Sequence, residues 1–118
     1  MSKLIPNLIE QVEAPPGFND GELIIDAATC EVTLKGRSIA LTSTEFRLLL
    51  FLARHPRWVF SADFIFERVW SYDSSAGSKA VKWYINRLRK KFGQITEHEY
   101  IVTKPGFGYR FIPRIITQ

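Results

Sequence analysis

The most regular alternation of apolar and polar positions lies near the carboxyl end of the chain, in residues 78–92 (SKAVKWYINRLRKKF). Projected on a helix at about 100° per residue, four apolar positions fall in one narrow sector: Val81, Ile85, Leu88 and Phe92. A stripe of this kind has to pack against the rest of the protein. The pattern therefore predicts an amphipathic helix over residues 78–92, with its apolar edge against the protein and its guanidinium groups free.

Two shorter stretches with helical spacing come earlier, and each has a recognisable start. Thr42-Ser43-Thr44-Glu45 has the form of a capping box, in which Thr42 is the N-cap and Glu45 reaches back to it. Pro56 ends this helix. Ser61 is the expected N-cap of a second helix that runs through Trp70.

Short segments rich in β-branched residues lie on both sides of the helices. Residues 22–26 (ELIID), 31–34 (EVTL) and 37–41 (RSIAL) are separated by turn formers and predict a small antiparallel sheet. Residues 100–104 and 108–113 flank a Pro-Gly-Phe turn and predict a β-hairpin.

The predicted order is sheet, helix, helix, amphipathic helix and hairpin, which is an α+β fold. The last two helices and the hairpin correspond to a helix-turn-helix followed by a wing. Residues 1–20 are weakly patterned and end in APPGFND, which resists regular structure. We therefore expect a linker or arm over residues 1–20 and one winged-helix domain over residues 21–118, a length that suits one hydrophobic core.

Positive charge is concentrated in the second half of the chain. Residues 1–56 contain five basic and seven acidic side chains, whereas residues 57–118 contain eleven basic and five acidic side chains. Six basic residues and no acidic residue lie between Asp73 and Glu97, although exposed helices usually mix the two signs. A helix that is apolar on one side and cationic on the other suits the major groove of DNA. An ordinary solvated surface is the alternative.

The inventory of reactive side chains indicates no enzyme, metal or cofactor. Cys30, the single cysteine, cannot form an internal disulfide, and with the distant His55 and His98 it makes no metal cluster. Cys30 is expected to be a small buried residue. No apolar run approaches the roughly 20 residues that span a bilayer, and the amino terminus lacks the apolar core of a secretory signal. We expect a cytoplasmic chain.

Four segments together resemble a known family: LTSTEFRLLLFLARHP, SADFIFERVWSYD, AVKWYINRLRKKF and YIVTKPGFGYRFI. In order and spacing they resemble the winged-helix effector domain of OmpR/PhoB-type response regulators, over about residues 22–112. The resemblance implies a four-stranded amino-terminal sheet and a DNA-binding transcription regulator of a two-component, phosphorelay system. It also implies a domain that is monomeric in isolation and binds direct repeats in double-stranded DNA as a tandem dimer.

The resemblance places the recognition helix at residues 78–92 and the wing at hairpin 100–113. Arg87 matches an arginine that reads a base, since guanidinium can bond guanine O6 and N7 together. Trp70 matches a tryptophan whose indole N–H reaches a phosphate, and Thr103 matches a threonine that touches the backbone. Positions matching contacts to phosphates or neighbouring bases are Lys79, Tyr84, Asn86 and Arg89. The full predicted set is Trp70, Lys79, Lys82, Trp83, Tyr84, Asn86, Arg87, Arg89, Lys90, Thr103 and Lys104.

The chain departs from the family pattern at several positions. Lys82 stands where the family often has an acidic residue, and Trp83 where it has a small aliphatic one. Trp83 could contact DNA through a sugar or a thymine methyl, form a partner surface, or belong to the core. Pro105 replaces the usual minor-groove arginine, so that readout depends on Lys104. Phe64 occupies a usually polar position, in the core or in an exposed patch.

Residues 71–77 correspond to the connection that often touches RNA polymerase, and a plain solvated loop is the alternative. The predicted contact residues are Ser71, Tyr72, Asp73, Ser74 and Ser75. The family normally carries a receiver domain, for which 118 residues leave no room. The sequence is therefore expected to be a separated effector domain or a regulator without a receiver. The alternative function is a winged-helix protein-interaction module that acts on the transcription machinery without direct base readout.

Overall fold

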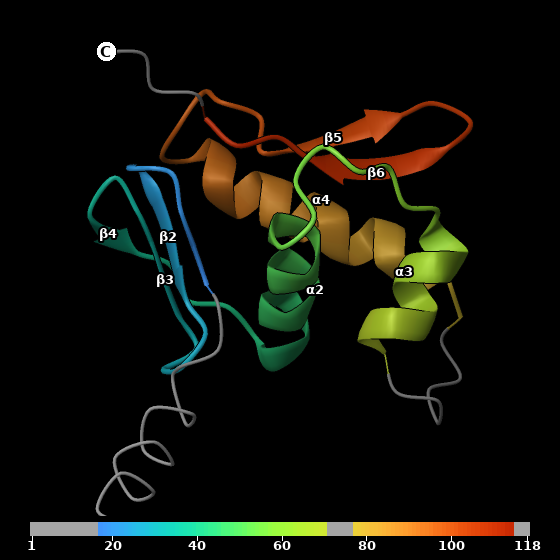
Figure 1. The fold of residues 1–118 in the computed structure, drawn as a ribbon, viewed down its shortest axis with the longest axis horizontal. Coiled ribbons are helices and arrows are strands. Elements are labelled where there is room, and N and C mark those ends of the chain that lie inside the picture. Colours follow the sequence, from blue (N-terminus) through green and yellow to red (C-terminus); the bar gives the residue numbers. More distant parts are fainter. Residues whose placement is uncertain (1–16, 71–76, 115–118) are drawn as a thin grey trace, which may run out of the picture.

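The computed structural model describes residues 17–70 and 77–114 (Figure 1). Its strands are β1 (Phe18–Asn19), β2 (Leu23–Asp26), β3 (Glu31–Leu34), β4 (Arg37–Ser38), β5 (Ile101–Lys104) and β6 (Gly108–Phe111). Its helices are α2 (Ser43–Ala53), α3 (Ala62–Val69) and α4 (Lys79–Gly93). The predicted α+β fold, with an antiparallel sheet, three helices and a carboxyl-terminal hairpin, is confirmed.

The amino-terminal sheet has four antiparallel strands in the order β1-β2-β3-β4. Leu23 of β2 pairs with Leu34 of β3, and all the side chains that alternate inward along these two strands are buried. Strand β1 lies within the segment expected to be a linker, so the linker does not extend to residue 20. Two residues are too few to show a strand period. β1 forms because Gly17 lets the backbone approach Ile25, where a Cβ would lie 2.1 Å from the carbonyl oxygen.

Asp20 also belongs to the folded domain. The Tyr100 hydroxyl and the Arg114 N–H both donate to Asp20 Oδ2 at 2.8 Å. Burial opposes ionisation of Asp20, but N–H bonds from Leu23, Arg114 and Glu22, together with the Tyr100 hydroxyl, lower its pKa overall. Burial and the bond to Asp20 raise the pKa of Tyr100. This contact ties the start of the sheet to the end of the hairpin.

The helix starts follow the predicted caps. The Thr42 hydroxyl accepts from Glu45 N at 3.2 Å, and Glu45 Oε1 accepts from Thr42 N at 2.9 Å, which completes the capping box. Ser61 Oγ accepts from Phe64 N at 3.1 Å at the start of α3. Trp70 is the extended C-cap of α3, so this helix ends one residue earlier than predicted.

Helix α2 lies at the centre of the molecule, between the sheet on one side and α3 on the other (Figure 1). Helix α4 runs across behind α2, and the hairpin of β5 and β6 lies along α4. The sheet, the helices and the hairpin contribute to one core, which contains Leu48, Leu49 and Leu52 of α2, although both residues of β4 are exposed. The core also includes Ile65 of α3 and Phe111 of β6, both fully buried.

The hairpin is bonded to the link between α2 and α3. Phe60 N donates to Tyr109 O and Tyr109 N donates to Phe60 O, each at 2.9 Å. At Gly108, where φ is +147°, a Cβ would lie 2.0 Å from Phe60 O. The close approach therefore requires glycine, and it sets the position of the hairpin relative to the helices.

Cys30 is exposed, which corrects the expectation that it is buried. It ends the turn between β2 and β3 with φ at 59°, so it does not lie in a strand. Within residues 17–70 and 77–114, no group of three His, Cys, Asp or Glu side chains could hold a metal ion. In the same ranges no helix is both long and apolar enough to cross a membrane.

Candidate nucleic-acid interface

Helix α4 has the predicted apolar edge. Val81, Ile85 and Leu88 are fully buried, and Phe92 is 3% exposed. The exposed side chains of the helix are Lys79, Lys82, Trp83, Asn86, Arg87 and Lys90, while Tyr84 and Arg89 are half-buried. Trp83 is 56% exposed, which rules out the interpretation that it belongs to the core.

Arg87 is exposed but has a partner on another helix. Its Nε donates to Glu45 Oε2 at 2.8 Å, while 43% of the Arg87 side chain stays exposed. Lys91 Nζ lies 2.7 Å from the other oxygen, Glu45 Oε1, and also donates to Ala40 O at 2.9 Å. Glu45 itself is fully buried. The expectation of a free guanidinium is therefore only partly right for Arg87.

The Glu45 carboxylate is held in its charged form. Burial alone would raise its pKa, but hydrogen bonds from Lys91, Arg87 and the Thr42 N–H, with the charge of Lys91, outweigh burial. Together they lower the pKa of Glu45 from 4.5 to about 2. Because Glu45 lies in the first turn of α2, one carboxylate completes the cap of α2 and also holds two cations of α4.

A row of four aromatic rings in contact runs from α3 to Arg87. Phe66 stacks on Trp70 with centroids 5.5 Å apart, and Trp70 meets Tyr84 at 5.2 Å and 66°. Tyr84 meets Trp83 edge to face at 4.9 Å and 83°. The Arg87 guanidinium carbon lies over the Trp83 ring, 4.8 Å from its centroid. Four rings and a cation therefore hold the exposed face of α4 in one arrangement.

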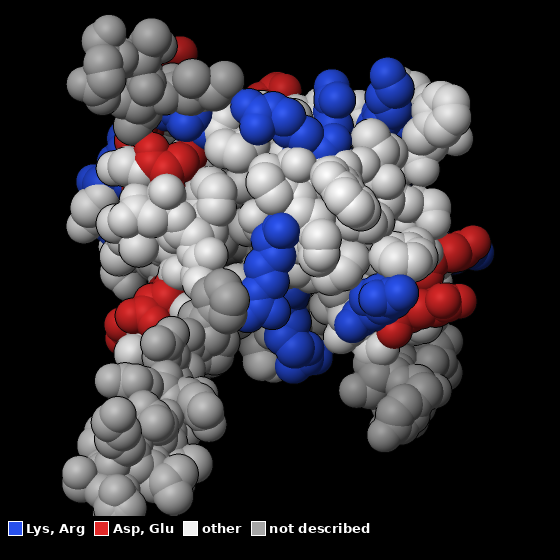
Figure 2. Space-filling model, in the orientation of Figure 1, with Lys and Arg blue, Asp and Glu red and all other residues white. Residues whose placement is uncertain are grey.

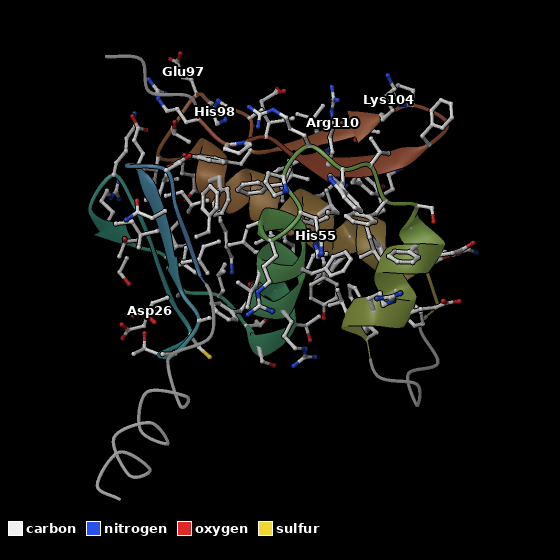
Figure 3. All side chains as sticks on the ribbon, in the orientation of Figure 1. Asp26, His55, Glu97, His98, Lys104 and Arg110 are labelled. Carbon is white, nitrogen blue, oxygen red and sulfur yellow. The ribbon has the colours of Figure 1, made fainter. Side chains whose placement is uncertain are left out.

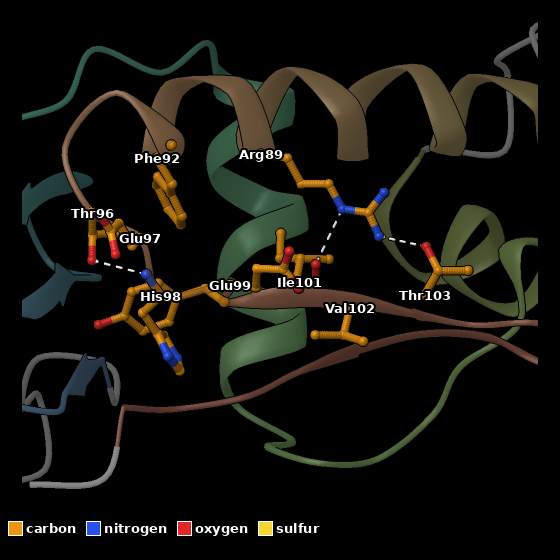
Figure 4. A pocket seen from close by; sticks show the side chains of 11 residues that line it. Arg89, Phe92, Thr96, Glu97, His98, Glu99, Ile101, Val102 and Thr103 are labelled. Carbon is orange, nitrogen blue, oxygen red and sulfur yellow. Dashed lines mark hydrogen bonds between the residues drawn. The ribbon is translucent and has the colours of Figure 1, made fainter.

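Arg89 joins α4 to the hairpin. Its Nε donates to Ile101 O at 3.1 Å, and its terminal nitrogens donate to Asn86 Oδ1 and Thr103 Oγ1. Figure 4 shows the bonds to Ile101 and Thr103 reaching from the helix to β5. The expectation of a free guanidinium is wrong for Arg89. The structure does bring together three predicted residues, Asn86, Arg89 and Thr103.

A groove of about 530 Å³ lies between the carboxyl end of α4 and β5 (Figure 4). Arg89 and Thr103 lie at one end of it, and Glu97, His98 and Glu99 line the other. Glutamates repel phosphate, so they mark where the basic surface around α4 ends.

The hairpin has a basic outer end. Lys104 projects from the hairpin next to its turn, far from Glu97 and His98 (Figure 3), whereas Arg110 lies opposite Val102 within β6 and is half-buried. Lys104 is exposed, and Phe107 at the turn is 68% exposed. On the face seen in Figure 2, basic side chains follow the hairpin, and Asp and Glu lie mainly at the two sides.

The remaining predicted residues divide between half-buried and undescribed positions. Trp70 is half-buried in the ring row, so any contact of its indole with phosphate would come from a packed side chain. The predicted polymerase-contact residues Ser71, Tyr72, Asp73, Ser74 and Ser75 lie outside the described residues.

Sequence reasoning missed Glu45 as part of this surface. It identified Glu45 only as a capping residue, because its partners on α4 lie 42 and 46 positions away. One available signal was that Glu45 directly precedes the apolar run of α2, which places a carboxylate at the edge of the core. Buried carboxylates need cationic partners.

Comparisons with known proteins agree with this arrangement. The family model described as "Transcriptional regulatory protein, C terminal" matches residues 36–111. Transcriptional regulatory protein TrcR of Mycobacterium tuberculosis is 45% identical over 93 residues, which are 79% of this chain and 36% of TrcR. The chain spans less than half the length of the curated relatives it matches.

Solved structures with the same fold include DNA-binding domains. The RstA DNA-binding domain of Klebsiella pneumoniae, in complex with the RstA box, gives a TM-score of 0.71 at 29% identity and covers 85% of this chain and 100% of that one. Response regulator DrrB of Thermotoga maritima, an OmpR/PhoB homolog, gives 0.73 at 31% identity, covering 92% and 49%. With its four-stranded sheet, three helices and hairpin, the chain belongs to the OmpR/PhoB-type family of transcriptional regulatory protein C-terminal domains.

Proposed function

We propose that this chain binds duplex DNA sequence-specifically, as the effector domain of a transcriptional regulator. The observation that carries the proposal is helix α4, whose apolar edge is buried while its basic residues face outward beside the hairpin. Such a helix fits the major groove, where phosphates attract Lys and Arg and base edges lie between them. The RstA domain named above was solved with its DNA box, which supports this assignment.

The contacts divide into base reading and positioning. Arg87 reads a base with its terminal nitrogens, because Glu45 occupies its Nε. Asn86 and Trp83 read bases beside Arg87. The phosphate contacts come from Lys79, Lys82, Lys90, Trp70, Tyr84, Thr103 and Lys104. Arg89 positions the hairpin through Thr103 in addition to any phosphate contact. Pro105 has no side-chain hydrogen-bond donor. Lys104 therefore takes the minor-groove contact that an arginine usually makes in the family.

The proposal extends to the assembly. The domain is a monomer alone and binds direct repeats as a tandem dimer, and the connection at residues 71–75 touches RNA polymerase. It acts in the cytoplasm, as part of a two-component system with a phosphorelay and without catalysis by this domain.

The test is to select duplexes from a random pool and to measure affinity by fluorescence anisotropy at several salt concentrations. Arg87→Lys keeps a cation beside Glu45 but loses the fork that bonds guanine O6 and N7. We expect it to cost about 1–3 kcal/mol at the selected site and to relax preference at one base pair. Lys79→Ala should weaken selected and random duplexes alike and lower the salt slope by about one.

Lys35→Ala is the matched control for Lys79→Ala, because Lys35 is exposed in the turn between β3 and β4, beside the carboxyl end of α4, whereas Lys79 lies at its amino end. It should leave affinity and salt slope nearly unchanged. Base preference that survives Arg87→Lys would contradict the assignment of Arg87, and equal effects of the two lysine changes would contradict a localised phosphate contact.

A protein-interaction module is the second candidate, favoured by the exposed aromatic residues outside α4. Trp58 is 62% exposed, Phe107 68% and Phe64 36%. A module of this kind would bind duplex DNA weakly and without sequence preference, so the same selection experiment discriminates the two functions.

A further inference from the structure

Trp83 is exposed, yet its ring contacts two neighbouring side chains of α4. Tyr84 packs edge-on against it at 4.9 Å, and the Arg87 guanidinium lies over it at 4.8 Å. We propose that Trp83 and Arg87 form one reading unit, in which Arg87 bonds a guanine and Trp83 contacts the 5-methyl group of a thymine in the adjacent base pair. This inference rests on the proposed function.

Arg87 is oriented before any ligand arrives. The bonds recorded for it within the described residues use only Nε, which donates to the buried Glu45 at 2.8 Å. The guanidinium carbon lies over the Trp83 ring, 4.8 Å from its centroid. A guanidinium bonded at Nε and in contact with an aromatic ring loses less conformational freedom when its terminal nitrogens bind a ligand.

The spacing of the two groups fits neighbouring base pairs. Base pairs in duplex DNA are stacked about 3.4 Å apart, and the guanidinium carbon lies 4.8 Å from the Trp83 centroid. Because the guanidinium carbon lies over the ring, an Arg87 in the plane of a guanine would have the indole on one side of that plane, toward an adjacent base pair. Along the major groove, thymine is the base that presents a methyl group there, and apolar side chains contact that methyl.

Trp83 is suited to an apolar contact because its ring needs little further ordering. Tyr84, its edge-on neighbour, packs on Trp70, which stacks on Phe66 of α3. The ring is 56% exposed, so it offers apolar area to a ligand. Lys82 precedes it and Asn86 lies one turn later, both exposed, so the ring is the apolar part of a polar surface.

The test removes single methyl groups from DNA. In the duplex selected by the wild-type chain, each thymine next to the guanine read by Arg87 is replaced by 2′-deoxyuridine, which lacks only the methyl. Affinity should fall about three- to fivefold at one of these positions, the effect of one buried methyl group. Trp83→Ala should lose a similar or larger factor on the thymine duplex and become indifferent to the replacement.

Trp58→Ala is the matched control, since Trp58 is also exposed but lies on the link between α2 and α3. It should keep the full response to deoxyuridine. Trp83→Gln, a polar replacement, provides a second variant, and circular dichroism checks that each variant is folded.

Two outcomes would overturn the inference while the proposed function stands. One is a wild-type chain that ignores every deoxyuridine replacement. The other is a Trp83→Ala or Trp83→Gln variant that keeps the methyl response, as a contact of Trp83 with sugar would predict. If no sequence is enriched from the random pool, the proposed function fails and the inference fails with it.

Discussion

At the scale of single residues, Glu45 holds two basic side chains of α4, Arg87 and Lys91, in fixed positions. A buried ion pair stabilises a protein only when its geometry is good and its remaining hydrogen-bonding atoms are satisfied. Glu45 meets this condition, because Thr42, Arg87 and Lys91 all donate to its two oxygens within 2.9 Å. Loss of the carboxylate charge would leave Arg87 and Lys91 close together without their counter-ion.

The pH dependence of stability follows from the lowered pKa of Glu45. A carboxyl whose folded pKa is about 2, below its ordinary 4.5, stabilises the fold above pH 4.5 and loses that effect as the pH falls toward 2. We expect Glu45→Gln to lower the free energy of unfolding by about 2–3 kcal/mol at pH 7. The difference from wild type should shrink between pH 4.5 and 2. Urea unfolding followed by circular dichroism at a series of pH values measures it.

Glu67→Gln is the control for this prediction, because Glu67 is an exposed carboxylate of α3. It should change stability by less than about 0.5 kcal/mol. A Glu45→Gln difference that stays constant down to pH 2 would show that shape, and not charge, explains the loss of stability.

At the scale of secondary-structure elements, Arg89 makes α4 and the hairpin one unit. Its three nitrogens bond the carbonyl of Ile101, the amide of Asn86 and the hydroxyl of Thr103. A planar guanidinium can hold three such partners at once, whereas an ammonium group concentrates its donors at one point. The hairpin therefore keeps its position on the helix through a side chain that the family resemblance predicted to contact DNA.

Arg89→Lys should loosen the hairpin while keeping the charge of α4. The loss of about 1–2 kcal/mol of local hydrogen bonding should speed amide exchange in β5 and β6 about five- to thirtyfold. Exchange in β2 and β3 should stay unchanged, because those strands make no bond to Arg89. Hydrogen–deuterium exchange followed by NMR gives both rates.

Lys90→Gln separates charge from bonding in the same experiment, since Lys90 is exposed on α4 and carries the same charge. It should leave exchange in the hairpin unchanged. Equal acceleration in both sheets of the Arg89→Lys variant would indicate global destabilisation and contradict a local link.

Whether an element could be predicted depends on how far apart in the sequence its interacting residues lie. The α4 stripe and the Thr42 cap were predictable, because they depend on residues three or four apart. Strand β1 was missed because two residues carry no period, and it forms only where Gly17 meets Ile25. The Glu45–Arg87 pair joins residues 42 positions apart, so no local pattern contains it.

At the scale of the whole molecule, the hairpin is held from two sides. Arg89 bonds it to α4, and the paired bonds between Phe60 and Tyr109 join it to the link between α2 and α3. This second connection depends on Gly108, whose missing side chain lets Phe60 approach. The angle between the hairpin and α4, and so the ability of both to meet one duplex, depends on these two contacts.

Gly108→Ala tests that dependence against Gly106→Ala, a substitution in the turn that precedes β6. Both glycines have positive φ, +147° and +84°, but an added Cβ meets nothing within 4 Å at Gly106 and lies 2.0 Å from Phe60 O at Gly108. Gly106→Ala should therefore cost about 1 kcal/mol of backbone strain. Gly108→Ala should cost more than about 3 kcal/mol, because Phe60 must also move.

Urea unfolding measures both costs, and NMR shows whether the amide signals of Phe60 and Tyr109 shift. We expect these signals to shift in Gly108→Ala and to stay in place in Gly106→Ala. DNA affinity should fall further in the Gly108 variant than in the Gly106 variant, at a temperature where both are folded, because only the first moves the hairpin off the link. Equal stability losses in the two variants would mean that backbone strain alone makes glycine necessary, and that Phe60 does not position the hairpin.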